Sequence, residues 1–159
     1  MAQIPTDYRK LQNAFRQHKL AVEKAGEVEE KDRAPYNLLL FYAVECGLKS
    51  IYLKRNGSPK KGTKPDSTPI EEIGHDLILL AKKLGLAKRL AKKPDLNHQK
   101  TEETELTFRS LRQGEISGPW GIKKIHEAWR YGVKIDYDDE QEIIKRLKEL
   151  CIYIQTQLA

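Results

Sequence analysis

The densest group of side chains that could do chemistry in this sequence is His126, Glu127, Trp129, Arg130 and Tyr131. His126 and Arg130 are four positions apart, so a helix would place them on the same face. On such a face a histidine can act as a general base and a guanidinium group can bind a phosphate. We therefore predict His126 and Arg130 as a candidate catalytic pair. The simpler interpretation, which we favour, is that Trp120, Trp129 and Tyr131 are packing anchors around the segment 113–122.

The other histidines and the two cysteines are weaker candidates. His18 follows the spacing of an apolar helix face and is expected at the edge of the core, whereas His75 stands where a helix is expected to begin. Cys46 and Cys151 lie on apolar helical faces and are expected to be reduced core residues. The sequence shows no glycine-rich phosphate loop, nucleophile elbow or clustered set of metal ligands, so we predict no metal and no cofactor.

A basic region between Lys54 and Lys93 is the second candidate site. It contains eleven Lys or Arg residues and four Asp or Glu residues, so its local charge of +7 accounts for the whole formal excess of +6. Such a patch would bind the phosphates of RNA or DNA through counterion release. The residues predicted to bind nucleic acid are Lys60, Lys61, Lys64, Lys82, Lys83, Lys88, Arg89, Lys92 and Lys93. The alternative is that these side chains only solvate the surface. Few aromatic residues interleave with them, so base stacking is not expected in this region.

The composition is typical of a globular protein, with 159 residues, 33% charged residues and 39% hydrophobic residues. This length favours a single domain over residues 1–159. The pI of about 9.2 favours acidic partners. No N-terminal segment resembles a signal peptide, so we predict a cytoplasmic location.

The longest nearly uncharged stretch runs from Ala34 to Arg55, and the other elements are expected to pack around it. Its apolar residues cover most of a helical circumference, which is typical of a central core helix. Pro35 suits the first turn of that helix. Glu45 and Lys49 near the middle argue against a membrane span. They form an i, i+4 pair that is expected at the edge of a bundle or at a dimer seam.

Further helices are predicted on both sides of this stretch, and no segment shows a convincing strand pattern. Thr6 or Asp7 can cap a helix that runs to about Lys24, and the last helix begins at Asp138 or Asp139. Intermediate helices are predicted from His75 or Asp76 to 84, over 106–112 and over 122–131. Segments 56–69 and 113–122, which are rich in glycine and proline, are expected to be mobile loops. The fold class predicted from this pattern is all-α.

Three short segments resemble the HEPN family, the small helical proteins of prokaryotic toxin–antitoxin and defence systems. FYAVECGLKSIYL at 41–53 is similar to the family's second helix with its ExxLKxxL pattern, and HDLILL at 75–80 is similar to the HDL start of its third helix. AWRYG at 128–132 resembles the RY step before the final helix. The resemblance implies an up-and-down bundle of four to five helices that is often a homodimer.

The sequence departs from this family at the catalytic motif. Many HEPN proteins resemble metal-independent ribonucleases, with an arginine followed after four to six residues by a histidine. None of the four histidines here has an arginine at that distance before it. The nearest mimic is Lys92 or Lys93 before His98, and lysine lacks the planar fork that binds phosphate in a bidentate manner. The usual catalytic assignment therefore does not transfer to this chain.

Three functions follow as expectations. The first is a catalytically degenerate module that binds nucleic acid or assembles with a protein partner in a prokaryotic defence or toxin–antitoxin-like system. The second is a metal-independent ribonuclease that uses His126 and Arg130. The third is a purely structural scaffold with no role for the lysines. The resemblance supplies the biological context, because a fold does not determine a function.

Overall fold

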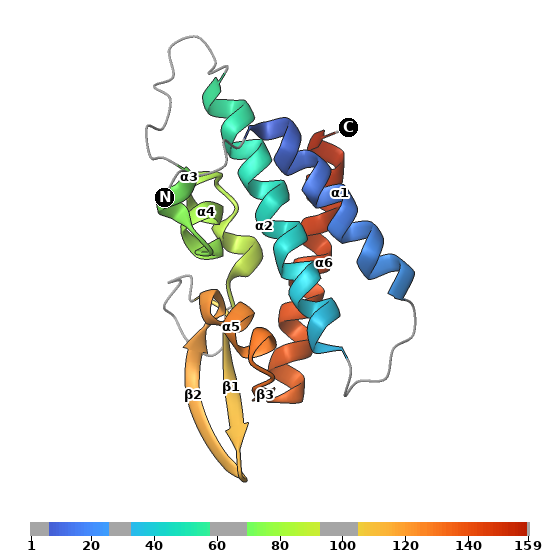
Figure 1. Ribbon diagram of the computed structural model, residues 1–159. Helices are drawn as coiled ribbons and strands as arrows, with labels where there is room; N and C mark the ends of the chain where they lie inside the picture. The colour runs from blue at the N-terminus through green and yellow to red at the C-terminus, as the bar shows by residue number, and fades with distance from the viewer. Residues whose placement is uncertain (1–6, 26–32, 58–69, 93–104, 159) are drawn as a thin grey trace.

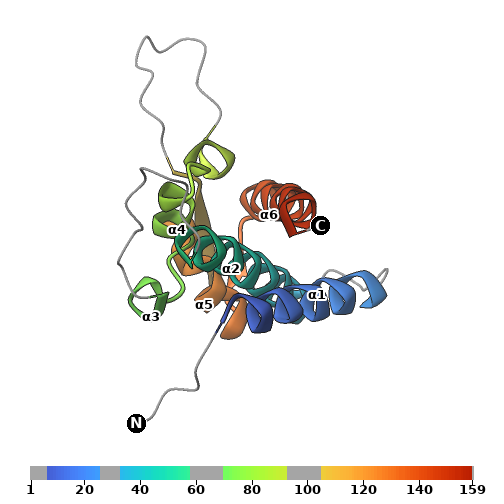
Figure 2. The ribbon, with the colours of Figure 1, turned by 90° about the horizontal axis from the view of Figure 1, so that it is seen from above.

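The computed structural model describes residues 7–25, 33–57, 70–92 and 105–158. Three long helices, α1 (Tyr8–Ala25), α2 (Ala34–Gly57) and α6 (Tyr137–Leu158), form its main body. Helix α2 lies in the middle, with α1 and α6 on one side and α4 (Leu77–Lys83) on the other, as Figures 1 and 2 show. None of the helices in these described ranges is long and apolar enough to cross a membrane.

Helix α2 is the centre of the core, as its apolar composition predicts. It packs against α1, α4, α6 and the short helix α5 (Ile125–Arg130). Phe41, Ala43 and Val44 have no exposed surface, although at about 100° per residue they point in different directions around the helix. The helix begins at Ala34 as expected and continues to Gly57. Neighbours on several sides explain why this helix has no polar face.

The first helix and the helix after Gly74 also follow their predictions. Asp7 caps α1, because its Oδ1 accepts a hydrogen bond of 2.9 Å from the backbone N–H of Lys10. Asp76 caps α4 through a bond of 3.1 Å from the backbone N–H of Leu79. The segment before Gly74 forms a separate one-turn helix, α3 (Ile70–Ile73). A 3₁₀ turn, η2 (Ala87–Leu90), follows α4.

The last helix begins slightly earlier than expected. Its first residue is Tyr137, and Asp136 rather than Asp138 or Asp139 accepts the hydrogen bond from the backbone, at 3.1 Å from the N–H of Asp139. The predicted apolar stripe of this helix is confirmed as buried. Its members are Ile143, Leu147, Leu150, Ile154 and Leu158.

A small antiparallel sheet corrects the expectation of an all-α fold. Strand β1 (Thr107–Arg112) pairs with β2 (Glu115–Gly121) and with the two-residue strand β3 (Lys134–Ile135), in the order β2-β1-β3. The hairpin extends from the lower end of the helical layer in Figure 1. The protein is therefore predominantly helical, with a three-stranded sheet added to the helices.

Residues 106–112 and 113–122 are where the sequence prediction was wrong. The expected short helix over 106–112 is strand β1, and most of the expected loop over 113–122 is strand β2. Gln113 and Gly114, both with positive φ, form the turn between the two strands. Gly118 and Pro119 form a bulge, because two residues of β2 stand opposite Arg109 alone. The glycines and the proline thus shape a hairpin rather than prevent regular structure.

The remaining segments connect the sheet to the core. The 3₁₀ turn η3 (Ile122–Lys124) follows β2 directly and leads into α5 without a break. This pair replaces the single helix predicted over 122–131. Phe108, Trp129 and Ile135 belong to the same hydrophobic core as the residues of α2. The expected loop over 56–69 lies almost entirely outside the described residues, which resume at Ile70.

Gly47 provides a test of the packing around α2. A Cβ atom at this position would lie 2.6 Å from Cγ2 of Ile154 and 3.0 Å from Cδ2 of Phe15. Alanine favours a helix over glycine by about 1 kcal/mol, but overpacking a core costs roughly 1–3 kcal/mol. We expect Gly47→Ala to lower the free energy of unfolding in urea by about 1 kcal/mol. In an Ile154→Ala background the same change should be neutral or stabilising. Equal destabilisation in both backgrounds would contradict the packing explanation.

Candidate active site

Glu45 is a buried carboxylate in the middle of the apolar helix α2. Its residue is only 5% exposed, and its Oε1 accepts a hydrogen bond of 2.6 Å from Nδ1 of His75. Lys49, one turn further along α2, donates to the same oxygen at 3.4 Å. A buried carboxylate is stable only when it is paired and hydrogen-bonded. Glu45 therefore requires both partners, and it holds His75 against α2.

His75 lies in the turn between α3 and α4. Gly74 has a φ of +56°, a conformation that glycine adopts without strain, and the N-cap residue Asp76 follows His75 directly. The turn is thus fixed on both sides of the histidine. The side chain of His75 is 48% exposed although its Nδ1 is bound to a buried group. His75 consequently connects the interior of the protein with its surface.

His126 lies on α5 beside His75. The centroids of the two imidazole rings are 4.8 Å apart, and the ring of His126 stacks on Phe41 with a centroid distance of 5.1 Å. Nδ1 of His126 is 2.8 Å from the backbone carbonyl oxygen of Lys123. Stacking and this hydrogen bond fix the orientation of the ring.

Burial lowers the pKa of His126 below its ordinary value, because desolvation disfavours the charged imidazolium. The hydrogen bond to the carbonyl of Lys123 acts in the opposite direction, and the nearby His75 adds to the lowering. The residue is 7% exposed. His126 is therefore mainly neutral at neutral pH, which is the state that a general base needs.

Arg130 completes the group from the end of α5. Its Nη2 donates a hydrogen bond of 2.6 Å to the hydroxyl oxygen of Tyr42 on α2. The Tyr42 ring lies 6.0 Å from that of His75 and 6.3 Å from that of His18 on α1. We call the five residues Tyr42, Glu45, His75, His126 and Arg130 the histidine cluster.

The hydrogen bonds determine the tautomers of both histidines. A carboxylate and a backbone carbonyl only accept, so Nδ1 of His75 and Nδ1 of His126 each carry a proton. Nε2 is then the nitrogen on each ring that can exchange a proton with a substrate. The histidine cluster therefore contains two oriented imidazoles and a guanidinium group close to each other. This set can move protons and bind an oxyanion.

The predicted pair His126 and Arg130 lies within this cluster, but the two side chains have different partners. His126 contacts His75 and Phe41, whereas Arg130 contacts Tyr42. Sequence reasoning correctly placed His75 before a helix and paired Glu45 with Lys49. The sequence did not predict that Glu45 and His75 lie close to His126. The sequence feature that could have indicated this contact is Glu45 itself. An acidic side chain within an otherwise apolar helix needs partners from elsewhere in the fold.

The predicted basic region is only partly within the described residues. Lys60, Lys61, Lys64 and Lys93 lie outside them. Lys82 and Lys83 are at the end of α4, Lys88 and Arg89 are in η2, and Lys92 follows that turn. The guanidinium of Arg89 lies 4.5 Å from the ring centroid of Tyr153, so this residue packs against α6. Nucleic-acid binding by this region stays a prediction.

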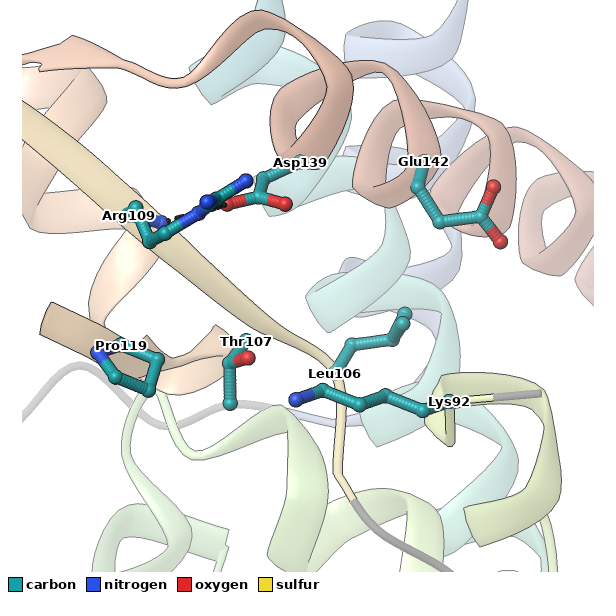
Figure 3. A pocket seen from close by; sticks show the side chains of 7 residues that line it. All are labelled: Lys92, Leu106, Thr107, Arg109, Pro119, Asp139 and Glu142. Carbon is teal, nitrogen blue, oxygen red and sulfur yellow. Dashed lines mark hydrogen bonds and ion pairs between the residues drawn. The ribbon is translucent and has the colours of Figure 1, made fainter. Parts of the chain in front are cut away.

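A hollow of about 520 Å³ lies where the hairpin meets the beginning of α6 (Figure 3). Arg109 dominates it, but its guanidinium is bound to Asp139 at 3.0 Å and to Asp136 at 3.3 Å. The two carboxylates neutralise the arginine and attach β1 to α6. The residues that line the hollow are Lys92, Leu106, Thr107, Arg109, Pro119, Asp139 and Glu142. With its central cation neutralised, this hollow is a weaker candidate for an anion site than the histidine cluster.

In the part of the chain that the structure describes, the cysteines and possible metal ligands form no second site. Burial raises the pKa of both Cys46 and Cys151 to about 11, so neither is a thiolate at neutral pH. Within the described ranges, no group of three or more His, Cys, Asp or Glu side chains is arranged to hold a metal ion.

Comparison with known proteins returns no match for this chain among protein-family models, curated proteins or solved structures.

The lowered pKa of His126 predicts a pH dependence of stability. The unfolded chain binds a proton at His126 near pH 6.5, whereas the folded protein binds it only at lower pH. The free energy of unfolding should therefore fall as the pH decreases below about 6.5. In His126→Asn, whose amide can still donate to the carbonyl of Lys123, this loss should be smaller. Urea unfolding of both proteins between about pH 5 and 7.5 measures the difference. If the free energy of unfolding changed with pH equally in the wild type and in His126→Asn, the lowered pKa of His126 would be contradicted.

Proposed function

We propose that this protein is a metal-independent ribonuclease whose active site is the histidine cluster. The observation that supports this most strongly is the pair of imidazoles, His75 and His126, with ring centroids 4.8 Å apart and with both tautomers determined by hydrogen bonds. The Arg–His motif of the HEPN family is absent from the sequence. Two histidines from separate elements, together with Arg130, supply equivalent groups.

RNA is the substrate whose cleavage requires the fewest catalytic groups from the protein. Its ribose 2′-hydroxyl is already held next to the phosphate that it attacks, so the nucleophile is intramolecular. The protein then has to remove one proton, donate another and balance the charge on phosphorus. The histidine cluster has one group for each task.

In the proposed reaction, Nε2 of neutral His126 accepts the proton of the 2′-hydroxyl while O2′ attacks phosphorus. The bond between phosphorus and O5′ breaks, and protonated His75 gives its Nε2 proton to the leaving O5′. Glu45 can balance the positive charge that His75 carries in the protonated state. Arg130 binds the non-bridging oxygens, whose charge increases in the transition state. The products are a 2′,3′-cyclic phosphate and a 5′-hydroxyl.

The HEPN-like bundle is part of the same proposal. The three segments that resemble the family contribute Glu45, His75 and Arg130, and all three residues belong to the histidine cluster. The helical order α1, α2, α4, α6 fits such a bundle, and the hairpin would be an addition to it. Homodimer formation and a role in a prokaryotic defence or toxin–antitoxin system are proposed from the resemblance alone.

A non-catalytic binding or assembly module is the second candidate function. The observation that favours it is the burial of His126, which is only 7% exposed and stacks on Phe41 as a core residue would. In this case the cluster would serve to hold α2, α4 and α5 together.

Cleavage of RNA in the presence of EDTA distinguishes the two candidates. We expect the wild-type protein to cut RNA and to leave cyclic phosphate ends. His126→Asn and His75→Gln should each reduce the rate about 10²- to 10⁴-fold, because each removes one proton-transfer group. His18→Gln is the matched control, since His18 lies on α1 with its ring centroid 6.3 Å from that of Tyr42 and is not a member of the histidine cluster. Intact RNA with the wild-type protein, or full activity in His126→Asn, would contradict the proposal.

Arg130 offers a second test, because its role depends on the shape of its side chain. Arg130→Lys keeps a positive charge but loses the planar fork, so kcat should fall about 10²-fold while the fold is unchanged. Tyr42→Phe removes the hydroxyl that accepts from Arg130, and its effect should be smaller because Tyr42 only positions the guanidinium. Steady-state kinetics on a short RNA would measure both. A lysine variant as active as the wild type would exclude Arg130 from transition-state binding.

A further inference from the structure

The segment from β1 to β3 is positively charged and lies outside the basic region identified in the sequence. Residues 107–135 contain six Lys or Arg and two Asp or Glu, a net charge of +4. Lys123 and Lys124 are both exposed and lie in η3, between the hairpin and α5. Lys124 pairs with Glu127 at the surface over a long distance of 3.6 Å, which contributes little. Two exposed lysines therefore directly precede the helix that carries His126.

Trp120 is the exposed aromatic residue at the end of β2. It is 44% exposed, yet its indole is held in place from two directions. Its Nε1 donates a hydrogen bond of 3.2 Å to Oγ of Ser110 on the neighbouring strand. Its Cδ1 would lie 2.9 Å from a Cβ atom at Gly118, so the indole packs closely over that glycine. The ring is thus oriented and still partly open to solvent.

The other tryptophan has a different role. Trp129 is 3% exposed, and its Nε1 donates to Glu140 at 3.0 Å within the protein. Trp129 is therefore a packing anchor, as interpreted from the sequence, whereas Trp120 and Tyr131, which are 44% and 73% exposed, are not. Trp120 contributes much less to the core, which leaves its indole surface for another molecule.

The sheet geometry argues against an apolar protein-binding patch around Trp120. Trp120 bonds to Ser110, whereas the exposed Ile116 pairs with Leu111, the next residue of β1. Neighbouring residues of a strand point to opposite faces, so Ile116 and Trp120 lie on different sides of the hairpin. A single exposed indole with cationic neighbours is instead the combination that binds single-stranded nucleic acid.

Lys123 connects this surface with the histidine cluster. Its backbone carbonyl accepts the hydrogen bond that orients His126, while its side chain is exposed. Trp120 and His126 are six positions apart in the chain, which spans at most about 20 Å between them even when extended. A single strand rises about 3.4 Å per nucleotide when stacked, so roughly six nucleotides or fewer cover this distance.

We propose that Trp120, Lys123 and Lys124 form a binding surface for single-stranded RNA that leads to the histidine cluster. An unpaired base stacks on the indole of Trp120, and the phosphates that follow lie on the two lysines. A duplex cannot offer a base to the indole unless it opens, so this surface selects unpaired RNA. The substrate preference rests on the proposed ribonuclease function, but the binding surface can be tested separately.

The first test uses the fluorescence of the two tryptophans and a 2′-O-methyl oligonucleotide, which lacks the attacking hydroxyl and cannot be cleaved. The oligonucleotide should quench the emission of the wild-type protein, and a duplex of the same length should not. In Trp120→Leu the quenching should disappear, because only the buried Trp129 remains. Affinity, measured with a labelled oligonucleotide, should fall about tenfold, and Trp120→Phe should restore most of it.

The second test measures the dependence of binding on salt. Lys123→Gln should make the slope of log K against log salt less steep by about 0.7, because one phosphate contact is lost. Lys148→Gln removes another exposed lysine, on α6, and should leave the slope unchanged. Circular dichroism of each variant would verify that the helices are retained.

Two results of the binding experiments would overturn the proposed surface. One is oligonucleotide binding that does not quench tryptophan emission and is equally tight in Trp120→Leu. The other is equal binding of duplex and single strand. A different result would contradict the ribonuclease function. In that case an RNA with a free 2′-hydroxyl would bind in a Trp120-dependent manner but would never be cut. Cleavage that is insensitive to Trp120 would instead retain the active site and reject the surface.

Discussion

The paired carboxylate of Glu45 is the interaction on which the arrangement of this protein depends. Helix α2 is apolar on nearly every side because it is the centre of the core, and one acidic residue in it needs partners from other elements. His75 supplies one partner at 2.6 Å and thereby brings the turn before α4 against α2. The contact of His75 with His126 then places α5 beside the same turn. The buried carboxylate of Glu45 thus both positions α4 and α5 against α2 and orients His75 within the cluster.

The sequence predicts the long helices well, because their patterns are strong and local. The central helix starts at Ala34 as expected, Asp7 and Asp76 are caps, and the last helix buries its apolar stripe. The prediction fails at β1 and β2, where the short run Leu106, Phe108, Leu111 fits neither period clearly. The pairing of β1 with β2 and β3, which determines its conformation, is a tertiary effect that the local pattern of residues does not contain.

The candidate site shows the same division between local and non-local information. His126 and Arg130 are neighbours on one helix, so their spacing identifies them. Glu45 and His75 are thirty positions apart, and His75 and His126 are fifty-one apart. Only the packing of α4 and α5 against α2 brings them together. The pKa of His126 depends on the same packing, because its burial comes from neighbours that are remote in sequence.

The position of β2 at the edge of the sheet has a consequence for self-association. An edge strand presents unpaired backbone groups that can recruit another chain, and all but the last residue of β2 are exposed. Pro119 has no N–H to offer, and the bulge at Gly118 and Pro119 interrupts the straight edge. The longest free strand edge in the described part of the chain is thus poorly suited to pairing with another strand. Sheet-to-sheet addition, the first step of many aggregation processes, is therefore disfavoured at this edge.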